Sequence, residues 1–295
     1  MSVQLTILGS GSSGNCAFLE CGETRLLIDA GLSGRQIRTR LLSIGRTPEK
    51  LTGILITHEH SDHIGGLVGL AAKLQIPIYC NRLTRDAIER QLEVRLDFRL
   101  FSTGDSFELG EVAVDTFSIP HDAYDPVGFL VRTPSSHLGF LTDLGHATKL
   151  VLQRLQSANV LLLEFNYDLK LLQDDPHRPW SVKQRIASRH GHLSNLAAAD
   201  VLAQLVCPQL RYVYLAHLSS DCNRPDLACE TAAQALEKNG AHHTRLQVAH
   251  QEKPCPTLNL ESTSIPPAPV MSAVPVSPPT SAPPPTVPPR PGWLL

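Results

Sequence analysis

The sequence predicts an α/β fold in which helices cover mixed β-sheets. Over residues 1–253, short apolar runs bounded by turn residues alternate with longer stretches whose apolar residues recur at helical spacing. Hydrophobic residues make up 42% of the 295 residues, which is enough to bury one large core. Sheets covered by helices are the usual packing for such an alternation, so we expect one large layered domain.

The expected elements follow one another along this region. Three short strands come first, at residues 3–8, 17–21 and 25–29, and the last two are joined by the turn Gly22-Glu23. Further strands are expected at residues 53–57, 76–80, 112–119, 127–132, 138–142, 160–165 and 211–216. Helices are expected at residues 34–43, 64–73, 84–92, 147–157, 195–206 and 225–238.

The composition changes abruptly at Pro254. Of the 23 prolines, 14 lie in residues 254–295, mixed with Ser, Thr, Ala and Val. Such a segment cannot bury enough apolar surface to offset its ordering entropy, so we expect a disordered tail after a domain that ends at residue 253. Residues 285–288 fit a PxxP pattern, and the sequence leaves open whether the tail is a plain solvated extension or binds a partner weakly.

Cysteine usage and apolar run lengths point to the cytoplasm. The seven cysteines are odd in number and form no CxxC pair, so we expect reduced thiols. The N-terminus enters a strand-like run without the features of a signal peptide. No apolar stretch approaches the roughly 20 residues that cross a bilayer, so we expect no membrane contact.

The charge pattern predicts no extended basic surface. The formal net charge is −2, which gives no global positive field for a nucleic-acid partner. Five Arg between residues 82 and 99 are interleaved with Asp and Glu, which indicates a solvated helix face with i,i+4 ion pairs.

The densest group of titratable residues directly follows an apolar strand. It comprises His58, Glu59, His60, Asp62 and His63. A core does not need this density, because each buried polar group requires a partner, and metal ions supply such partners. His58 and His60 can face the same side of an extended segment and hold one ion, while Asp62 and His63 reach a second. Mixed imidazole and carboxylate ligands suit Zn, Mn or Fe.

Three more candidate ligands each follow an apolar strand: His121, Asp143 and His217. Taken singly, such a histidine is more often a surface residue, but three of these residues together with the dense group favour metal binding. We therefore expect two divalent ions. The predicted ligands are His58, His60, Asp62, His63, His121, Asp143 and His217.

These motifs resemble the metallo-β-lactamase superfamily over residues 1 to about 250. Its five ordered motifs match Asp29, residues 58–63, His121, Asp143 and His217. The resemblance implies a four-layer αββα sandwich with two ions, Zn²⁺ or Mn²⁺, both bridged by Asp143. It also implies that Asp29 is not a ligand and instead braces the metal-binding loop.

Four strings are similar to the YycJ/WalJ-like subgroup of phosphodiesterases and exonucleases: residues 8–16, 121–129, 191–195 and 217–223. The similarity implies a two-metal phosphodiesterase or 5′–3′ exonuclease that acts on nucleic acid or nucleotide phosphodiesters. The nucleophile would be a hydroxide that bridges the two ions. Asp62 would orient or deprotonate the attacking water. The alternative is an acyl or thioester hydrolase of the glyoxalase II or lactonase type, because the same nucleophile attacks carbonyl carbon. A third hypothesis is a binding module without catalysis, which the full set of seven ligands disfavours.

Two further features are candidates for catalysis and substrate binding. His192 precedes a helix-like stretch and resembles the histidine that assists phosphodiester cleavage in RNase Z enzymes, so we expect it to stabilise charge or protonate the leaving oxygen. The alternative is that His192 is a structural residue that only neighbours the cap of this helix.

The Gly/Ser-rich loop after the first strand offers N–H and hydroxyl groups to an anionic substrate. The alternative is that this loop is only a tight turn. Its candidate residues are Ser10, Ser12, Ser13 and Asn15. Whether the chain forms a homodimer is left open.

Overall fold

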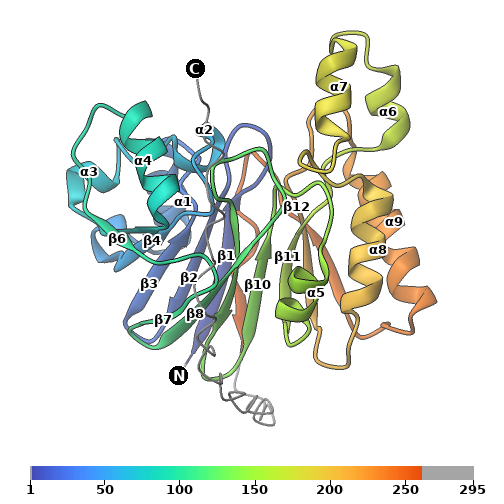
Figure 1. Ribbon diagram of the computed structural model, residues 1–295. Coiled ribbons are helices and arrows are strands. Elements are labelled where there is room, and N and C mark those ends of the chain that lie inside the picture. The colour runs from blue at the N-terminus through green and yellow to red at the C-terminus, as the bar shows by residue number, and fades with distance from the viewer. Residues whose placement is uncertain (1, 261–295) are drawn as a thin grey trace, which may run out of the picture. The chain divides into compact units, whose positions relative to one another are not determined.

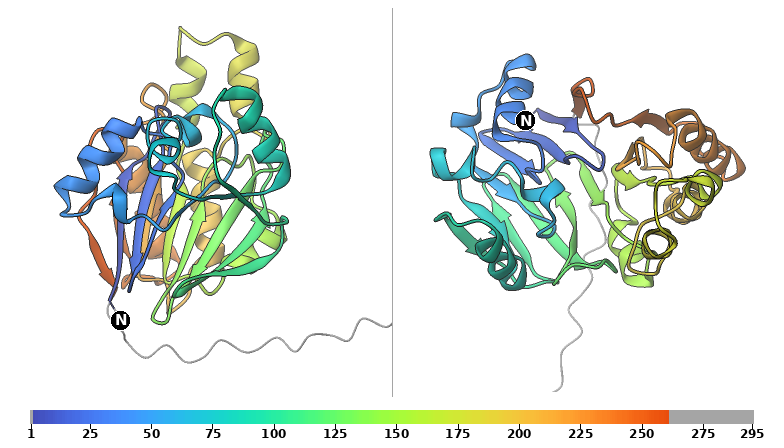
Figure 2. Two further views of the ribbon diagram at one scale, coloured as in Figure 1. Left: turned by 90° about the vertical axis from the view of Figure 1, so that its left-hand side faces the viewer. Right: turned by 90° about the horizontal axis from the view of Figure 1, so that it is seen from above.

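A computed structural model of the chain describes residues 2–260, in which two seven-stranded sheets pack against each other and helices cover the outer faces (Figure 1). The view along the sheets in Figure 2 shows the same order of layers, helix, sheet, sheet and helix. The α/β prediction is therefore confirmed for the described residues.

The first sheet joins the N-terminal strands to a strand from the end of the described chain. Its strand order is β14 (Leu258–Leu260), β1 (Val3–Gly9), β2 (Cys16–Cys21), β3 (Thr24–Ile28), β4 (Gly53–Leu55), β5 (Ile78–Cys80) and β6 (Phe98–Leu100). Strands β3 to β6 are parallel, and the pairs on the other side of β3 are antiparallel. Its helices are α1 (Gly34–Ser43), η1 (Pro48–Lys50), α2 (Ser61–Ile64), α3 (Ala71–Leu74) and α4 (Arg82–Gln91).

The second sheet is parallel at one side and antiparallel at the other. Its strand order is β13 (Arg245–Val248), β12 (Tyr212–Ala216), β11 (Val160–Glu164), β10 (His137–Leu141), β9 (Val127–Arg132), β8 (Val112–Ser118) and β7 (Ser106–Leu109). Its helices are α5 (Lys149–Leu155), α6 (Leu169–Asp174), α7 (Trp180–Ile186), α8 (Asn195–Leu205) and α9 (Pro225–Lys238). Helices α6 and α7 project beyond the ends of the strands, at the upper right of Figure 1.

The strands bury both faces, which explains why both sheets need a helical layer. In β2, Ala17 and Leu19 point into the core between the sheets, whereas Cys16 and Phe18 belong to the cluster under the first set of helices. A third cluster lies under α5, α8 and α9. Successive residues of a strand point to opposite faces, so these nearly continuous apolar runs fit strands that are covered on both sides.

The helix expected at residues 64–73 is wrong, since the chain forms only the short helices α2 and α3 there. The N–H of Gly66 donates to the carbonyl of Ala30 at 2.7 Å instead of continuing a helix. A Cβ on Gly66 would lie 2.4 Å from the carbonyl oxygen of Leu32. This close approach fixes the segment after the histidine-rich motif against the loop that follows β3.

The domain boundary expected at residue 253 is also wrong for residues 254–260. Strand β14 pairs with β1, and the N–H of Cys255 donates to the carbonyl of Ile7 at 2.9 Å. This strand satisfies backbone groups of β1 that would otherwise lie at a sheet edge. The rest of the predicted tail, with its PxxP match at residues 285–288, lies outside the described residues.

Three other expectations concern the described residues. All seven cysteines are unpaired, as predicted. A search of the described helices finds none that is both long and apolar enough to span a membrane. On α4, Arg82 pairs with Asp86 and Arg85 with Glu89, which confirms the expected solvated helix face.

Candidate metal centre

The candidate site lies where strands of both sheets end. Asp29 and His58 follow β3 and β4, while His121, Asp143 and His217 follow β8, β10 and β12. Because neighbouring parallel strands end at the same edge of a sheet, side chains from distant parts of the sequence meet there.

The backbone at these strand ends is strained. Asp29, Asp143 and His217 have φ values of 59°, 59° and 54°, and Gln75 is the one other non-glycine residue with positive φ in the described chain. Such conformations cost on the order of 1–3 kcal/mol each and persist only where the surroundings impose them. Three of the four residues therefore coincide with the site.

The first group of ligand atoms comes from His58, His60 and His121, whose atoms lie within 4.8 Å of one another. His121 Nε2 and His60 Nδ1 are 3.2 Å apart. Two nitrogens bound to one tetrahedral zinc would be about 3.4 Å apart, given metal–nitrogen distances near 2.1 Å. The Nδ1 of His121 donates to the carbonyl of Gly191 at 3.1 Å, so Nε2 is the ring nitrogen that could bind an ion.

His58 gives a test of whether this group fits a metal. Its Nδ1 lies 3.0 Å from the hydroxyl of Thr57, whereas its Nε2 is buried and has no hydrogen-bond partner among the described residues. A buried polar atom without a partner costs about 1–3 kcal/mol. A metal ion held by the three imidazoles would satisfy it, so the residues present fit the group.

The second group comprises Asp62, His63, Asp143 and His217. His217 Nε2 lies 3.1 Å from Asp62 Oδ2 and 3.3 Å from Asp143 Oδ1. His63 Nε2 lies 3.1 Å from Asp143 Oδ2, a buried oxygen with no hydrogen bond in the described residues. The rings of His58 and His63 are 4.2 Å apart, so the two groups adjoin. The structure thus brings together all seven residues that the sequence nominated.

Asp29 is buried against the histidine-rich motif. Its Oδ2 accepts a hydrogen bond from His63 Nδ1 at 2.8 Å, and its Oδ1 accepts one from the backbone N–H of Thr57 at 2.9 Å. The first contact leaves His63 Nε2 directed at Asp143. Burial opposes the charged form of His63, but Asp143 and Asp29 outweigh it and raise the pKa of this imidazole well above its ordinary value.

Glu164, at the end of β11, is a site residue that the sequence interpretation missed. This carboxylate is fully buried. Its Oε1 accepts hydrogen bonds from His192 Nδ1 at 2.8 Å and from His217 Nδ1 at 3.1 Å. Its Oε2 accepts one from the N–H of Leu193 at 2.8 Å. Burial raises its pKa, but His192 and His217 outweigh burial and lower the pKa to about 2. Like Asp143 and His217, it terminates an apolar strand, so the same signal was present in the sequence.

His192 lies beside the second group. Its ring stacks on that of His217 at 5.2 Å, and its side chain is 21% exposed. Burial opposes its charged form, but Glu164 outweighs burial and raises the pKa of His192 above its usual value. The α8 helix is capped by Ser194, whose hydroxyl accepts from the N–H of Ala197. His192 is therefore not needed as a cap.

The Gly/Ser-rich loop divides into buried and exposed residues. The hydroxyl of Ser10 donates to Asn15 Oδ1 and accepts from the N–H of His217, both at 2.8 Å. The amide of Asn15 lies 3.2 Å from His63 Nε2. These contacts hold Ser10 and Asn15 against the two ligand groups, and Ser10 also borders the pocket described next. Ser12 and Ser13 are exposed and line a pocket of about 240 Å³ with Ser219, Asn223 and His250.

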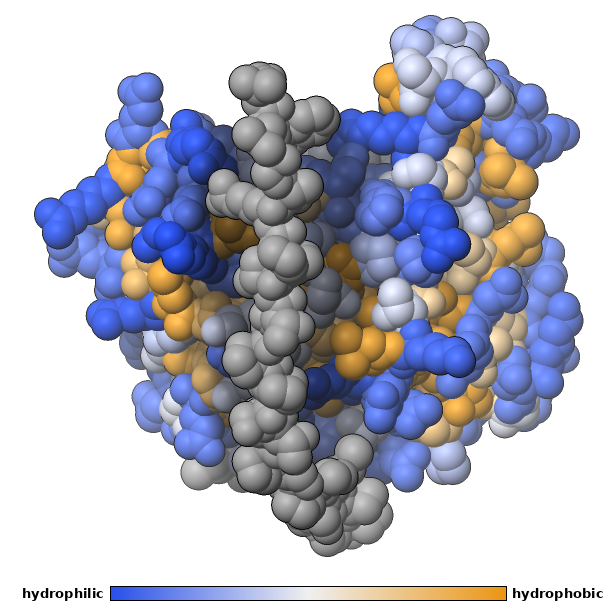
Figure 3. All heavy atoms as spheres, viewed as in Figure 1, coloured by the Kyte–Doolittle hydropathy of each residue, from blue (hydrophilic) through white to orange (hydrophobic). Residues whose placement is uncertain are grey.

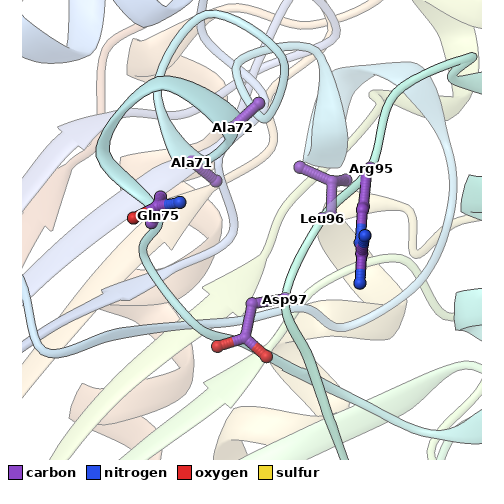
Figure 4. A pocket seen from close by; sticks show the side chains of 6 residues that line it. All are labelled: Ala71, Ala72, Gln75, Arg95, Leu96 and Asp97. Carbon is purple, nitrogen blue, oxygen red and sulfur yellow. The ribbon is translucent and has the colours of Figure 1, made fainter.

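A larger pocket, of about 690 Å³, lies elsewhere in the first sheet's helical layer. Figure 4 shows Arg95, Leu96 and Asp97 on one side of it and residues of α3 on the other. No residue of the two ligand groups lines it, so pocket size does not identify the site.

Comparisons with known proteins give relatives that match most of the chain. The model of the beta-lactamase superfamily domain matches residues 24–218. Exodeoxyribonuclease YycJ of Bacillus anthracis is 36% identical over 242 residues, which cover 81% of this chain and 91% of that protein. Exodeoxyribonuclease WalJ of Streptococcus pneumoniae is 37% identical over 235 residues, which cover 78% and 87%.

Among solved structures, the metallo-beta-lactamase fold protein YhfI from Bacillus subtilis superposes with a TM-score of 0.67 at 16% identity, over 88% of this chain and 99% of that one. At this identity the likeness concerns the fold alone. The motif order, the layered sheets and the sequence matches agree with one another. The chain belongs to the beta-lactamase superfamily and, within it, to the family that includes YycJ and WalJ.

Proposed function

We propose that the chain is a metal-dependent phosphodiesterase that acts as an exodeoxyribonuclease, with two divalent ions, Zn²⁺ or Mn²⁺, in the two adjoining ligand groups. The observation that carries this proposal is the pair of buried ligand groups with two orphaned atoms, His58 Nε2 and Asp143 Oδ2. The relatives YycJ and WalJ, both named exodeoxyribonucleases, support DNA as the substrate.

The donor atoms assign each residue a role toward the ions. His58, His60 and His121 would hold one ion, and Asp62, His63 and His217 the other, with the two carboxylate oxygens of Asp143 between the groups. Bound ions would supply Lewis acidity at the phosphate and lower the pKa of a water molecule toward neutrality.

The remaining steps belong to the protein's own side chains. Asp62 is partly exposed and its Oδ2 is fixed by His217 and Asn15, so it is placed to orient a water molecule or take its proton. Glu164 keeps the proton of His192 on Nδ1 and favours the charged ring, so His192 Nε2 can donate a proton to the leaving oxygen. Ser12 and Ser13 contribute hydroxyls at the pocket beside the site.

The proposal extends to the direction of cleavage and to the location of the protein in the cell. The proposed 5′–3′ direction is supported by the resemblance of residues 8–16, 121–129, 191–195 and 217–223 to the YycJ/WalJ-like subgroup. A cytoplasmic location follows from the seven unpaired cysteines.

The test is a comparison of substrates on one preparation of Mn²⁺- or Zn²⁺-reconstituted protein. We expect release of mononucleotides from the 5′ end of end-labelled DNA and turnover of a bis-aryl phosphodiester, with no turnover of thioesters or lactones. The Asp143→Asn variant should lose activity, while Asp200→Asn, at an exposed position of α8, should retain it. Turnover of a thioester or lactone without phosphodiester cleavage would establish the acyl hydrolase instead.

A further inference from the structure

A surface pocket of about 410 Å³ lies beside the candidate metal centre and has no role in the function proposed above. His121, a member of the first ligand group, lines it. The other lining residues include Ser118 at the end of β8, Thr148 and Leu150 at the start of α5, and His190. Three separate segments of the chain therefore meet at this pocket, and it shares one candidate ligand with the metal centre.

The segment that precedes His192 is fixed against the loop after β10. A Cβ on Gly145 would lie 2.2 Å from the carbonyl carbon of Arg189, so the two backbones are in direct contact. The Nδ1 of His146 donates to the carbonyl oxygen of Arg189 at 3.1 Å. Both contacts hold Arg189 beside the first turn of α5, which contributes two residues to the lining of the pocket.

The guanidinium of Arg189 has no negative partner. Its Nη2 donates to Nε2 of His146 at 3.2 Å, and this ring is neutral because its one N–H is already donated through Nδ1. Arg189 forms no ion pair with a carboxylate in the described residues. Asp122, next to His121, is itself paired with Arg185. The positive charge of Arg189 is therefore free to attract an anion.

A second cation lies at the start of α5. Lys149 stands between the lining residues Thr148 and Leu150, and it is exposed. It too forms no ion pair within the part of the chain that the structure describes. The hydroxyl of Thr148 accepts from the N–H of Val151, so its own hydrogen remains available as a neutral donor.

The two cations belong to segments without acidic residues. Residues 144–163 contain Lys149 and Arg154, residues 176–199 contain four Lys or Arg, and neither range contains Asp or Glu. The net charge of −2 gives no global positive field, yet it hides this local one. Figure 3 shows mainly hydrophilic side chains between the projecting α6–α7 region and α5, which does not resemble the apolar core of a protein interface.

We propose that this pocket, with the cations Arg189 and Lys149, binds phosphates of the DNA backbone next to the phosphodiester that is cleaved in the metal centre. Arg and Lys side chains and hydroxyls such as those of Ser118 and Thr148 are the usual partners of DNA phosphates. Such contacts fix the position of the DNA and do not read its sequence.

The distances along the chain suit such a site. Arg189 precedes His192 by three residues, so their Cα atoms are at most about 11 Å apart. One strand of DNA carries a phosphate per about 3.4 Å of helix axis, so this span covers about three phosphates. The inference rests on the proposed function and deepens it, because the phosphate-binding pocket favours a DNA polymer over a small diester.

The salt dependence of DNA binding tests these contacts, because each neutralised phosphate releases counterions. The probe is a phosphorothioate duplex that resists cleavage, bound to metal-reconstituted protein. Arg189→Ala and Lys149→Ala should each raise Kd about five- to tenfold near 0.1 M salt, and each should lower the slope of log Kd against log salt by about 1. Arg189→Lys keeps the charge and should retain the slope.

Lys238→Ala is the matched control for the loss of one positive charge. Lys238 is exposed at the end of α9, about 20 Å along this helix from Pro225. The control should bind the duplex with the Kd and the slope of the wild type.

Kinetics separate binding from damage to the metal centre. In Arg189→Ala and Lys149→Ala, KM for the cleavable duplex should rise by about the same factor as Kd, and kcat should stay within about twofold. Turnover of a bis-aryl phosphodiester should stay near that of the wild type, because this substrate has no neighbouring phosphate. If the wild-type protein cleaves no phosphodiester, the proposed function fails, while a smaller salt slope in the two variants would still support the phosphate-binding pocket.

Three results would overturn the phosphate-binding pocket. One is an unchanged Kd and slope in both alanine variants. Another is an equal loss of bis-aryl and DNA turnover in Arg189→Ala, which would show that its bond to His146 only supports the loop after β10. The third is an equal loss of affinity in Lys238→Ala, which would indicate diffuse attraction between the whole protein and DNA.

Discussion

At the residue scale, His190 and His192 are close together in the sequence but have different partners in the structure. His190 is exposed and lines a surface pocket beside His121, whereas His192 is hydrogen-bonded to Glu164 and stacked on His217. The sequence singled out His192 through its resemblance to RNase Z. It could not supply the partner, because Glu164 lies 28 residues away and meets His192 only through the fold.

We expect His192→Ala to lower kcat for phosphodiesters by a factor on the order of 10² to 10⁴, because a proton donor to the leaving oxygen acts in the transition state. Metal content should stay unchanged, since His121 and His217 keep their own partners. Steady-state kinetics and elemental analysis on one preparation measure both quantities. His190→Ala is the matched control, and near-normal kcat in His192→Ala would remove the catalytic role.

Glu164→Gln changes the charge of one oxygen and keeps the size of the side chain. The variant should weaken metal binding by about 10- to 100-fold, because Glu164 orients His217 through Nδ1. It should also lower kcat, because His192 loses the carboxylate that raises its pKa. Competition with a metal chelator measures the first effect. Unchanged metal affinity together with unchanged kcat would show that Glu164 serves only the fold.

At the scale of elements, the sequence predicts well those with a strong apolar pattern and misses those without one. The strands that bury both faces, such as β11 and β12, were predicted nearly to their ends. Strand β7 is short and half-exposed, and α7 buries no residue, so neither leaves a periodic apolar signal. The predicted helix at residues 64–73 failed because its glycines serve close backbone contact.

Gly66→Ala tests that close contact. The added Cβ would meet the carbonyl oxygens of Leu32 and Ala30 at 2.4 and 2.8 Å, so the segment after the histidine motif must move. We expect a loss of a few kcal/mol of stability and weaker metal binding. Gly45→Ala is a useful comparison, since its Cβ would meet open space, although its φ of 71° adds some strain. Equal urea midpoints for Gly66→Ala and the wild type would contradict the contact.

Truncation separates the folded end of the chain from the proline-rich segment. Removal of residues 261–295 should leave the melting temperature unchanged, as their composition predicts. Removal of residues 254–295 also deletes β14 and the buried Cys255, and we expect the melting temperature to fall by about 5–15 °C. Calorimetry on the two truncated chains measures the difference. Equal stability of both would show that β14 contributes nothing.

At the scale of the whole described region, two sheets place the ends of six strands at one site: β3, β4, β8, β10, β11 and β12. Local sequence predicted the seven candidate ligands because each follows an apolar strand. The way the sheets pack is a long-range property that periodicity does not contain, and it entered through resemblance to a family. The sequence separated His58 and His60 from Asp62 and His63. Only the three-dimensional structure assigns His121, Asp143 and His217 to one group or the other.

The central claim is that these seven residues hold two divalent ions, and elemental analysis of the purified, reconstituted protein tests it most directly. We expect close to two ions of Zn²⁺ or Mn²⁺ per chain in the wild type. In His121→Ala, we expect close to one ion, because the first group loses a ligand while Asp62, His63, Asp143 and His217 remain. A stoichiometry of one or less in the wild type after reconstitution, or two ions in both proteins, would contradict the claim.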